Sequence, residues 1–462
     1  MEINQSKQIS VGMLSLGCPK TLVDSELILG FLEPSRFRVA KHITDCDIAI
    51  LNTCAFIQDA KEESIDHILK LVELKEAGQI KAIIVLGCLV QRYHSELQDE
   101  LSEIDAFLGT ADYEQINEVL NRVIAKKTFS QVTAKPGFLY TSKMNRIPLT
   151  PFFSRYLKIS EGCDHVCSFC TIPKFRGKHR SRLIEDIVTE ARGLIASGTK
   201  ELILTGQDTT FFGRDTHHTY LLAKLLGELD SLNGLEWIRL LYAYPSCVTR
   251  ELIHAIRDLK RVCHYLDMPL QHVSDSMLQA MKRGTTKKTS YELIRRLRQE
   301  IPDLAIRTTF IVGFPGETDD DFKELLDFME YARFERLGVF MYSQEEESAS
   351  SALPNQVKHS IKEKRFDKAM MCQQAISFEN NNRLIGKKLQ VLIERQSDSD
   401  PNLFEGRSYM DAPEVDGVIY VQTFTQKKPR PGDFVSVQVT GTRDYDLVGL
   451  CTESEMISSH VS

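Results

Sequence analysis

Three cysteines occupy eight consecutive positions within the segment EGCDHVCSFCTIPKFRGKHRSR, residues 161–182. Cys163, Cys167 and Cys170 have the spacing C-x3-C-x2-C, and thiolates are soft ligands that suit iron–sulfur clusters and zinc. A structural zinc site takes four protein ligands, whereas no fourth cysteine lies near these three in the sequence. Three thiolates on a four-iron cube leave one iron with an open coordination site. The spacing therefore predicts a catalytic iron–sulfur cluster.

Three ordinary thiols, or a zinc site, are the alternatives at this motif. His165 or His179 would supply the fourth ligand of the zinc site, although neither gives a usual zinc-finger spacing. Under this hypothesis the chain is a zinc-stabilised binding module without catalysis. The place of the motif favours the cluster, because the cysteines directly follow the apolar run YLKISEG. They are therefore predicted to lie at the C-terminal end of a strand, where parallel barrels collect their active sites.

A second set of three cysteines lies in the first quarter of the chain. Cys18, Cys54 and Cys88 occur as LGCPK, NTCAF and LGCLV, and each follows an apolar run directly. In a parallel sheet all strand C-termini lie along one edge, which is where open α/β sheets bind ligands. We therefore expect these thiols to converge on a second metal cluster. The other five cysteines are expected to be packing residues, and they are Cys46, Cys247, Cys263, Cys372 and Cys451.

The elements that position these cysteines follow from the hydrophobic pattern, which predicts an α/β protein. Apolar runs alternate with amphipathic stretches over residues 9–130, which indicates a parallel α/β domain. Residues 131–152 contain three prolines and no clear period, and we expect a linker there. Six strand–helix units over 153–385 predict a partial (β/α)6 barrel. Residues 386–455 show short alternating strands separated by Gly, Pro and Asp, which predicts a small all-β barrel or sandwich.

The composition is that of an ordinary globular chain. The 462 residues are 42% hydrophobic and 26% charged. The polar start MEINQSKQIS is not a secretory signal, and no apolar run is long enough to cross a bilayer. We therefore expect a cytoplasmic protein with no membrane partner, in which eleven cysteines do not form a disulfide framework. The net charge of −7 argues against a strongly basic nucleic-acid-binding protein.

The C-x3-C-x2-C motif, with the aromatic Phe169 before its last cysteine, resembles that of the radical S-adenosylmethionine (SAM) superfamily. The resemblance implies that three cysteines hold a [4Fe–4S] cluster, whose open iron binds the amino and carboxylate groups of SAM. Reduction of the cluster would cleave SAM to a 5′-deoxyadenosyl radical, so that the cofactor carries the difficult chemistry.

The same resemblance implies SAM contacts at the strand ends LTGQD, PLQH and FIVGFPGET. A turn between strand and helix can also require glycine for its own dihedral angles, so the glycines in these segments have a structural explanation as well. The candidate SAM-binding residues are Phe169, Thr205, Gly206, Gln207, Gln271 and Gly313.

Two three-cysteine sets in one chain resemble the arrangement in the methylthiotransferases, which insert a CH3–S group at an unactivated C–H bond. The resemblance covers the whole chain and identifies the last domain as a TRAM-type, OB-like β domain. It implies two [4Fe–4S] clusters and SAM as cofactors, with the second cluster held by Cys18, Cys54 and Cys88. It also implies an electron donor and a sulfur source as partners.

Two motifs distinguish the branches of this family. SLGCPKTLVDSE near the start and CSFCTIPKFRGKHRSR after the cluster motif resemble the RimO branch, whereas the tRNA-modifying MiaB branch more often shows YGCQMN. The segment YAYP, residues 242–245, also departs from the TSHP-like segment of the tRNA branch. The RimO branch implies methylthiolation of an aspartate β-carbon in small-subunit ribosomal protein twelve. The alternative substrate is a tRNA adenosine.

Charge gives a separate indication of the partner. Residues 384–455 contain 8 Lys or Arg and 12 Asp or Glu. Domains that bind RNA are basic, so this acidic domain favours a basic ribosomal protein over tRNA, although a merely solvated surface is the alternative. Since it contributes none of the six cysteines, we expect its deletion to spare SAM cleavage.

The segment after the cluster motif is basic and is expected near the mouth of the active site. Its side chains are candidates for holding the substrate aspartate or the SAM carboxylate, or for pairing with nearby acids. They are Lys174, Arg176, Lys178, His179, Arg180 and Arg182.

Overall fold

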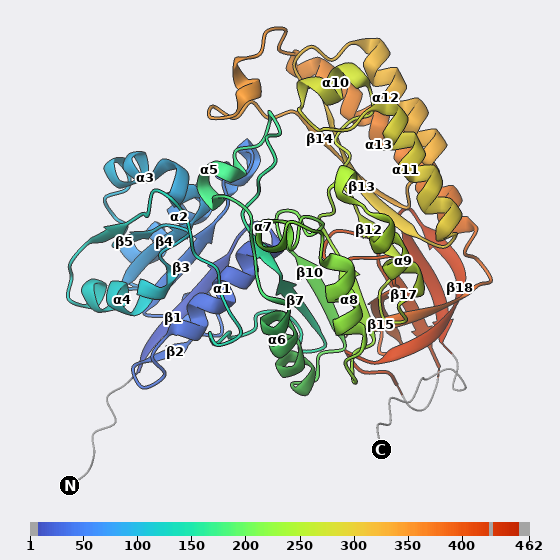
Figure 1. The fold of residues 1–462 in the computed structure, drawn as a ribbon. Helices are drawn as coiled ribbons and strands as arrows, with labels where there is room; N and C mark the ends of the chain where they lie inside the picture. Colours follow the sequence, from blue (N-terminus) through green and yellow to red (C-terminus); the bar gives the residue numbers. More distant parts are fainter. Residues whose placement is uncertain (1–7, 425–427, 452–462) are drawn as a thin grey trace.

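The computed structural model describes residues 8–424 and 428–451. Residues 425–427 and 452–455 of the predicted C-terminal domain lie outside this part. An N-terminal α/β domain in blue, a barrel in green to orange and a small β domain in red pack against one another (Figure 1). This arrangement confirms the predicted α/β fold class. The residue boundaries of the domains stay predictions.

The N-terminal domain is built on a parallel sheet with the strand order β2-β1-β3-β4-β5-β6. In the central strands Ser15 pairs with Asn52, and Thr53 pairs with Gly87. The strands β1, β3 and β4 therefore end level with one another. The six strands are β1 (Ile9–Ser15), β2 (Phe37–Val39), β3 (Ile48–Thr53), β4 (Ala82–Gly87), β5 (Ala106–Leu108) and β6 (Phe129–Gln131).

Helices cover both faces of this sheet. α1 and α4 pack on one face, and α2 and α3 pack on the other. Every residue of β3 and β4 is buried for this reason, which explains why these strands read as unbroken apolar runs. The helices are α1 (Pro19–Phe31), α2 (Gln58–Glu76), α3 (Cys88–Glu100) and α4 (Ile116–Ile124), with short 3-10 turns η1 (Ile43–Asp45) and η2 (Tyr113–Gln115).

The segment predicted as a linker has no helix or strand between Gln131 and Ser154, yet it is bound on both sides. The Ser142 backbone N–H donates to Asp186 Oδ1 at 2.8 Å. Arg146 forms ion pairs with both Glu26 of α1 and Glu190 of α6. The segment therefore joins the N-terminal domain to the barrel.

Six parallel strands form the partial barrel, as predicted, in the order β7-β10-β11-β12-β13-β14. A parallel bridge between Ile238 and Val262 joins its two halves. The strands are β7 (Ser154–Lys158), β10 (Glu201–Thr205), β11 (Trp237–Leu240), β12 (Tyr265–Asp267), β13 (Ala305–Val312) and β14 (Arg336–Met341), and a small antiparallel pair is formed by β8 (Ser160–Glu161) and β9 (Arg180–Ser181).

Helices follow the barrel strands in sequence, and most of them lie on its outside (Figure 1). Their leucines and isoleucines form one large core with the outward-facing residues of the strands. They are α5 (Ile172–Arg176), α6 (Ile184–Ala196), α7 (Arg214–His217), α8 (Leu222–Asp230), α9 (Arg250–Asp258), α10 (Asp275–Ala280), α11 (Lys287–Glu300), α12 (Asp319–Ala332) and α13 (His359–Asn382), with 3-10 turns η3 (Pro245–Cys247) and η4 (Ala349–Ala352).

The C-terminal domain is a closed barrel with the order β15-β16-β17-β19-β18. Closure decides between the barrel and the sandwich that the sequence left open, and it leaves no free strand edge. The strands are β15 (Lys388–Gln396), β16 (Leu403–Arg407), β17 (Ile419–Thr423), β18 (Phe434–Arg443) and β19 (Asp446–Cys451).

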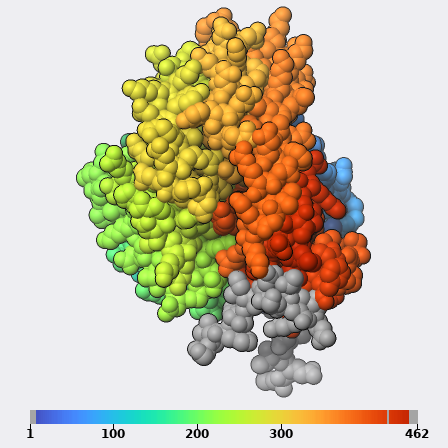
Figure 2. Space-filling view, turned by 90° about the vertical axis from the view of Figure 1, so that its right-hand side faces the viewer, coloured from blue at the N-terminus to red at the C-terminus, as the bar shows by residue number. Residues whose placement is uncertain are grey.

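This small barrel packs into the large one. Tyr156, Ile203 and Tyr265 belong to barrel strands, and they share one buried apolar cluster with residues of the C-terminal domain such as Leu392 and Val437. Figure 2 shows the red domain directly beside the orange part of the barrel domain. The two domains therefore share a core.

The N-terminal domain spans the open side of the partial barrel. Within the described residues no ladder joins β14 back to β7. On the β7 side, Val23 and Leu27 of α1 pack in the same apolar cluster as Tyr156. On the β14 side, Lys61 Nζ and Arg92 Nη1 lie 3.0 and 3.2 Å from Glu345 Oε2. The N-terminal domain is thus held at both edges of the opening.

Candidate active site

The sheet edge of the N-terminal domain carries the three cysteines of the second set. Cys18 caps the start of α1, Cys54 follows β3 directly, and Cys88 begins α3. A Cβ atom added at Gly17 would lie 2.8 Å from Cys54 Cβ, so the turn before α1 touches the end of β3. Burial, together with the nearby Cys88 and Cys18 thiols, raises the pKa of Cys54 to about 12. The structure places these three residues at neighbouring strand ends and helix starts along one edge of the sheet, and that they hold a cluster stays a prediction.

Two buried cations flank this set. Arg176 Nη2 donates to Cys88 Sγ at 3.1 Å. Lys20 lies two residues after Cys18, and its Nζ lies 3.2 Å from the centre of the Tyr242 ring. Burial alone would raise the pKa of Cys18, but attraction to Lys20, the hydrogen bonds with Thr21 and attraction to Arg176 together outweigh burial, and the pKa is lowered. Burial likewise disfavours the Lys20 charge, yet its neighbours, Cys18 first among them, raise its pKa.

The C-x3-C-x2-C cysteines lie in the loop between β8 and α5. The Cys163 backbone N–H donates to Gly177 O at 3.1 Å, and Cys170 N–H donates to Cys167 O at 3.1 Å. Cys167 Sγ accepts a hydrogen bond from Arg283 Nη1 at 3.4 Å. Burial raises the pKa of Cys163 and of Cys170 to about 12. The thiols therefore need a metal to be held as thiolates at neutral pH, which is what an iron–sulfur cluster provides.

The residues around this loop suit a polar ligand. Four side-chain atoms near the C-terminal ends of β7 and β10 and in the cysteine loop are buried without a hydrogen-bond partner. Buried polar groups normally have a partner, so these atoms are free to bind one. They are Ser160 Oγ, Thr171 Oγ1, Thr205 Oγ1 and Gln207 Oε1. Three thiols beside unsatisfied hydroxyl and amide groups fit a cluster with SAM.

The candidate SAM residues on β10 lie where the sequence placed them. Thr205 ends β10, and Gly206 allows the turn to approach Ser160, whose Oγ would lie 2.6 Å from an added Cβ. Gln207 Nε2 donates to Glu161 Oε1 at 2.6 Å. The amide is thus oriented by Glu161 with its carbonyl oxygen still free.

Of the remaining candidates, Gly313 directly follows β13, whereas Gln271 lies four residues beyond the end of β12. Gln271 has a φ of +73°, and its backbone pairs with Thr309 and Ile311 at 2.8 Å each. Gly313 has a φ of +72°, and an added Cβ would clash with Lys362. Phe169 packs against the apolar residues around Cys167. SAM binding by these residues stays a prediction.

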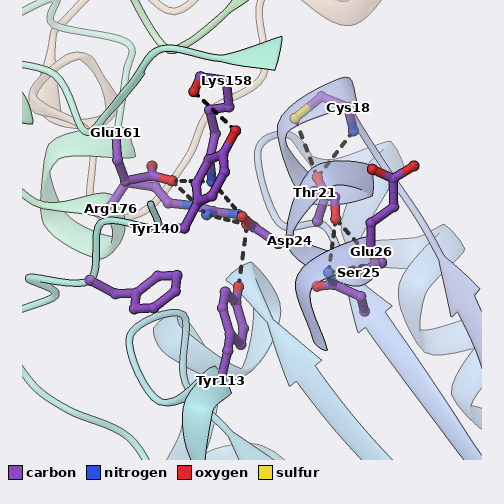
Figure 3. Close-up of polar contacts among 12 residues, drawn as sticks. Cys18, Thr21, Asp24, Ser25, Glu26, Tyr113, Tyr140, Lys158, Glu161 and Arg176 are labelled. Carbon is purple, nitrogen blue, oxygen red and sulfur yellow. Dashed lines mark hydrogen bonds and ion pairs between the residues drawn. The ribbon is translucent and has the colours of Figure 1, made fainter. Parts of the chain in front are cut away.

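A buried network of charges lies near Cys18 and connects α1 to the barrel domain (Figure 3). Arg176 Nη1 donates to Asp24 Oδ2 at 2.6 Å, and Lys158 Nζ lies 2.8 Å from Glu161 Oε2 and also pairs with Asp24. Burial raises the pKa of Glu161, but Lys158 and Arg176 outweigh it and lower the pKa to about 2. Because α5 begins two residues after Cys170 and ends at Arg176, which contacts Cys88, this short helix leads from one set to the other.

Sequence reasoning missed the two members of this network that lie in apolar segments. Asp24 interrupts the apolar stretch TLVDSELILGFL, and Lys158 interrupts YLKISEG. A charged residue is almost never fully buried unless it is paired, so each of these was a signal for a buried partner. The partner itself was not visible, because 134 positions separate Lys158 from Asp24.

The basic segment after the cysteines mostly pairs with groups of the chain itself. Arg182 binds Asp186 and Glu190 at 2.6 Å each. Lys174 Nζ donates to Glu347 O at 2.8 Å, and Arg180 donates to backbone carbonyls. Of the roles considered from the sequence, pairing with groups of the chain itself describes Lys174, Arg180 and Arg182.

The histidines considered as zinc ligands are held by other groups. His165 Nε2 lies 2.6 Å from Asp208 Oδ2, and its ring stacks on Tyr244 with centroids 3.6 Å apart. His179 Nε2 lies 3.1 Å from Ser181 Oγ. Burial lowers the pKa of His179, which keeps this ring neutral.

Comparisons with known proteins agree with this arrangement. Residues 157–329 match the radical SAM superfamily, residues 10–109 match "Uncharacterized protein family UPF0004", and residues 385–451 match the TRAM domain. A "Ribosomal protein uS12 methylthiotransferase RimO" from Desulforamulus reducens is 46% identical over 441 residues, which cover 95% of this chain and 99% of that protein. The protein of the same name from Geobacter sulfurreducens is 45% identical over 95% of this chain and 98% of its own length.

The chain belongs to the RimO family. Membership confirms the resemblance to the RimO branch. The chain is therefore a radical SAM enzyme with a TRAM domain. Membership also assigns SAM and a [4Fe–4S] cluster to the chain, and the non-catalytic zinc module is not supported. The number of clusters is not fixed by these matches.

Solved structures share the RimO-family fold at low sequence identity. A radical SAM methyltransferase, TsrM, from Kitasatospora setae with tryptophan substrate and a SAM analogue bound superposes with a TM-score of 0.56, at 14% identity over 80% of this chain and 89% of that chain. A second TsrM structure, with cobalamin and a [4Fe–4S] cluster, gives a TM-score of 0.53 over 72% of each chain. Within the described residues, no helix is long and apolar enough to cross a bilayer.

Several acidic residues of the TRAM domain form ion pairs within this RimO-family chain. Asp411 pairs with Arg336 of β14, and Asp416 Oδ1 lies 3.2 Å from Arg307 Nε of β13. Glu394 pairs with Arg407 inside the domain itself at 2.6 Å. Part of the acidic excess therefore binds the barrel and is not displayed to a partner, which weakens the charge argument for a basic substrate.

Proposed function

We propose that this chain methylthiolates the β-carbon of an aspartate in small-subunit ribosomal protein twelve (uS12). The observation that supports it is the pair of three-cysteine sets, which lie at strand ends in two domains and are linked through α5 and Arg176. The substrate comes from the relatives, which are named as methylthiotransferases of uS12 and match over 95% of the chain.

The cysteine sets have separate roles in this proposal. Cys163, Cys167 and Cys170 would hold the [4Fe–4S] cluster that supplies the electron for cleavage of SAM. Cys18, Cys54 and Cys88 would hold a second cluster, whose open iron binds sulfur. The chain would take an electron donor and a sulfur source as further partners, and we place its activity in the cytoplasm with the ribosomal protein.

The surrounding residues would orient the reactants. The unsatisfied groups Thr205 Oγ1 and Gln207 Oε1 are buried beside the first set and are suited to bind the polar end of SAM. Glu161 holds the Gln207 side chain, because it accepts its amide hydrogen.

Anaerobic assay with both substrates tests the activity. Reconstituted enzyme with SAM, a reductant and sulfide is expected to add a CH3–S group to the uS12 aspartate, detected by peptide mass spectrometry. Unmodified uS12 together with a methylthiolated tRNA adenosine would replace our proposal by the tRNA alternative.

Iron content tests the second cluster. Replacement of Cys18, Cys54 and Cys88 by Ala should lower bound iron to about half, since each set is expected to hold one four-iron cluster. It should retain SAM cleavage in part but not sulfur insertion. Replacement of Cys163, Cys167 and Cys170 should also remove about half of the iron and abolish 5′-deoxyadenosine formation. Unchanged iron in the first variant would contradict the second cluster.

A further inference from the structure

Most buried cations of the chain already have a carboxylate partner. Lys158, Arg176 and Arg182 pair with acids around the cysteine sets. The cations at the interface with the TRAM domain are paired too, as in the ion pair between Arg407 and Glu201. These side chains cannot bind a substrate carboxylate without losing a partner, which in a buried site is costly.

Lys20 is different. Its side chain is 8% exposed, and within residues 8–424 and 428–451 no carboxylate oxygen lies within 4.0 Å of its Nζ. Its partner is the face of the Tyr242 ring at 3.2 Å. A ring face stabilises an ammonium group only partly, and a buried charge is normally paired. The thiol that attracts it most is Cys18, which a cluster would take as a ligand, so Lys20 still lacks a carboxylate partner.

The Tyr242 ring is held in place by its backbone. Tyr242 has a φ of +59°, in the left-handed region that a tyrosine rarely adopts. Its N–H donates to Asp267 Oδ2 at 3.0 Å, and its carbonyl accepts from Thr209 N at 3.1 Å. Asp267 also binds Arg307 Nη1 at 2.9 Å, so its carboxylate is already engaged. A strained conformation fixed in this way is typical of functional sites.

The place of Lys20 fits a substrate group. It is two residues from Cys18 at the edge that carries the second cysteine set, and it reaches across to the end of β11 in the barrel. Cys18 and Tyr242 beside it are partly exposed, whereas Lys20 itself is buried. The ammonium group thus lies between the N-terminal domain and the barrel, beside residues that solvent reaches.

We propose that Lys20, seated on Tyr242, binds the side-chain carboxylate of the substrate aspartate and selects aspartate over its amide. This rests on the proposed function, whose acceptor atom is the carbon next to that carboxylate. Binding the carboxylate at Lys20 holds this carbon beside Cys18 and the second set.

Binding of purified uS12 and of its Asp→Asn form tests the proposal. The holoenzyme with both clusters is titrated against each fluorescently labelled protein by anisotropy, under anaerobic conditions. The wild-type chain should bind the aspartate form about ten- to a hundredfold more tightly, because a hydrogen bond to a charged partner exceeds one to a neutral amide. Lys20→Met, which keeps the length and removes the charge, should bind both forms equally. Lys20→Arg should retain the preference.

Controls separate this role from support of the cluster. Lys70→Met, on the exposed face of α2, should leave the preference unchanged. Lys20→Met should retain its iron, whereas loss of iron would show that Lys20 supports Cys18 and would overturn the proposal. Should Lys20→Met fail to fold, Tyr242→Leu, which removes the ring below the ammonium group, is expected to reduce the preference.

The experiments distinguish failure of the proposed function from failure of the role assigned to Lys20. A wild-type chain that neither binds nor modifies uS12 contradicts the proposed function and, with it, this inference. A wild-type chain that modifies uS12, combined with a Lys20→Met variant that still prefers aspartate, contradicts the role of Lys20 alone.

Discussion

Arg176 holds together groups that no single domain contains. Its guanidinium donates to Asp24 and Cys88 of the N-terminal domain and lies 3.5 Å from Glu161 of the barrel domain. The planar guanidinium presents several N–H donors in fixed directions, which a lysine cannot reproduce. Since the side chain is buried, these contacts are not screened by water.

Removal of this charge should destabilise the fold. We expect Arg176→Met to lower the free energy of unfolding by about 3–5 kcal/mol, because it leaves two buried carboxylates, Asp24 and Glu161, to share Lys158 as their cation. Thermal or denaturant unfolding of the apoprotein measures it. Arg192→Met, at an exposed site on α6, should change the stability by less than about 0.5 kcal/mol. Equal stability of the two variants would contradict the importance of the network.

At the scale of elements, the cysteine loop depends on a close approach of two backbone segments. Gly162 has a φ of +79°, and a Cβ atom there would clash with the carbonyl oxygens of Gly177 and Lys178. The loop closes here, because Cys163 N–H donates to Gly177 O. Glycine is therefore required for both its conformation and its size.

Substitution at this position should disturb the cluster loop. Gly162→Ala is expected to cost about 2 kcal/mol or more of stability and to lower the iron bound by Cys163, Cys167 and Cys170. Gly193→Ala in α6 is the matched control, since nothing lies within 4 Å of an added Cβ there. It should stabilise the chain by about 0.5–1 kcal/mol, as alanine favours a helix. Full iron loading of Gly162→Ala would contradict this reasoning.

The sequence predicted elements better than contacts between them. Long buried strands such as β4 and β13 were found because their apolar runs are unmistakable, whereas β2, β5 and β6, of three residues each, leave too little pattern. The six cysteines were predicted from spacing and strand ends. Lys20 was not, because its partner Tyr242 lies more than 200 residues away and only folding brings them together.

At the scale of the whole molecule, the TRAM domain is part of the barrel's interior. Glu201 of β10 accepts from Arg239 Nε at 2.8 Å and from Arg407 Nη2 of the TRAM domain at 2.6 Å. Trp237 packs against Phe434 with ring centroids 4.7 Å apart. Loss of the domain would expose both the charges and the apolar residues.

Truncation should therefore affect more than substrate binding, contrary to our expectation from the sequence. A chain ending at residue 385 is expected to be poorly soluble, to unfold at a lower temperature and to lose SAM cleavage. Differential scanning calorimetry and 5′-deoxyadenosine analysis measure this. A truncated chain that melts and cleaves SAM like the full-length protein would show that the barrel is independent.

The ion pairs at this interface should make the free energy of unfolding depend on pH in the acidic range. Burial raises the pKa of Glu201, but Arg407 and Arg239 outweigh it and lower the pKa from 4.5 to about 2. The ionised group therefore stabilises the fold above pH 4.5, and this contribution is lost as the pH falls from 4.5 towards 2. Glu201→Gln should be less stable at pH 7 but should show a shallower loss of stability over that window. An identical pH profile for both chains would contradict the assignment.

The shared core between the two barrels also limits how such enzymes can be recombined. A chimera that takes its last domain from a relative would join foreign side chains to Glu201, Arg307 and Arg336, which lie on three different strands of the recipient. Exchange at the chain boundary alone leaves these charges mismatched. Grafting would succeed only if the matching strand residues travel with the donor domain, so the two segments must be inherited as a single unit.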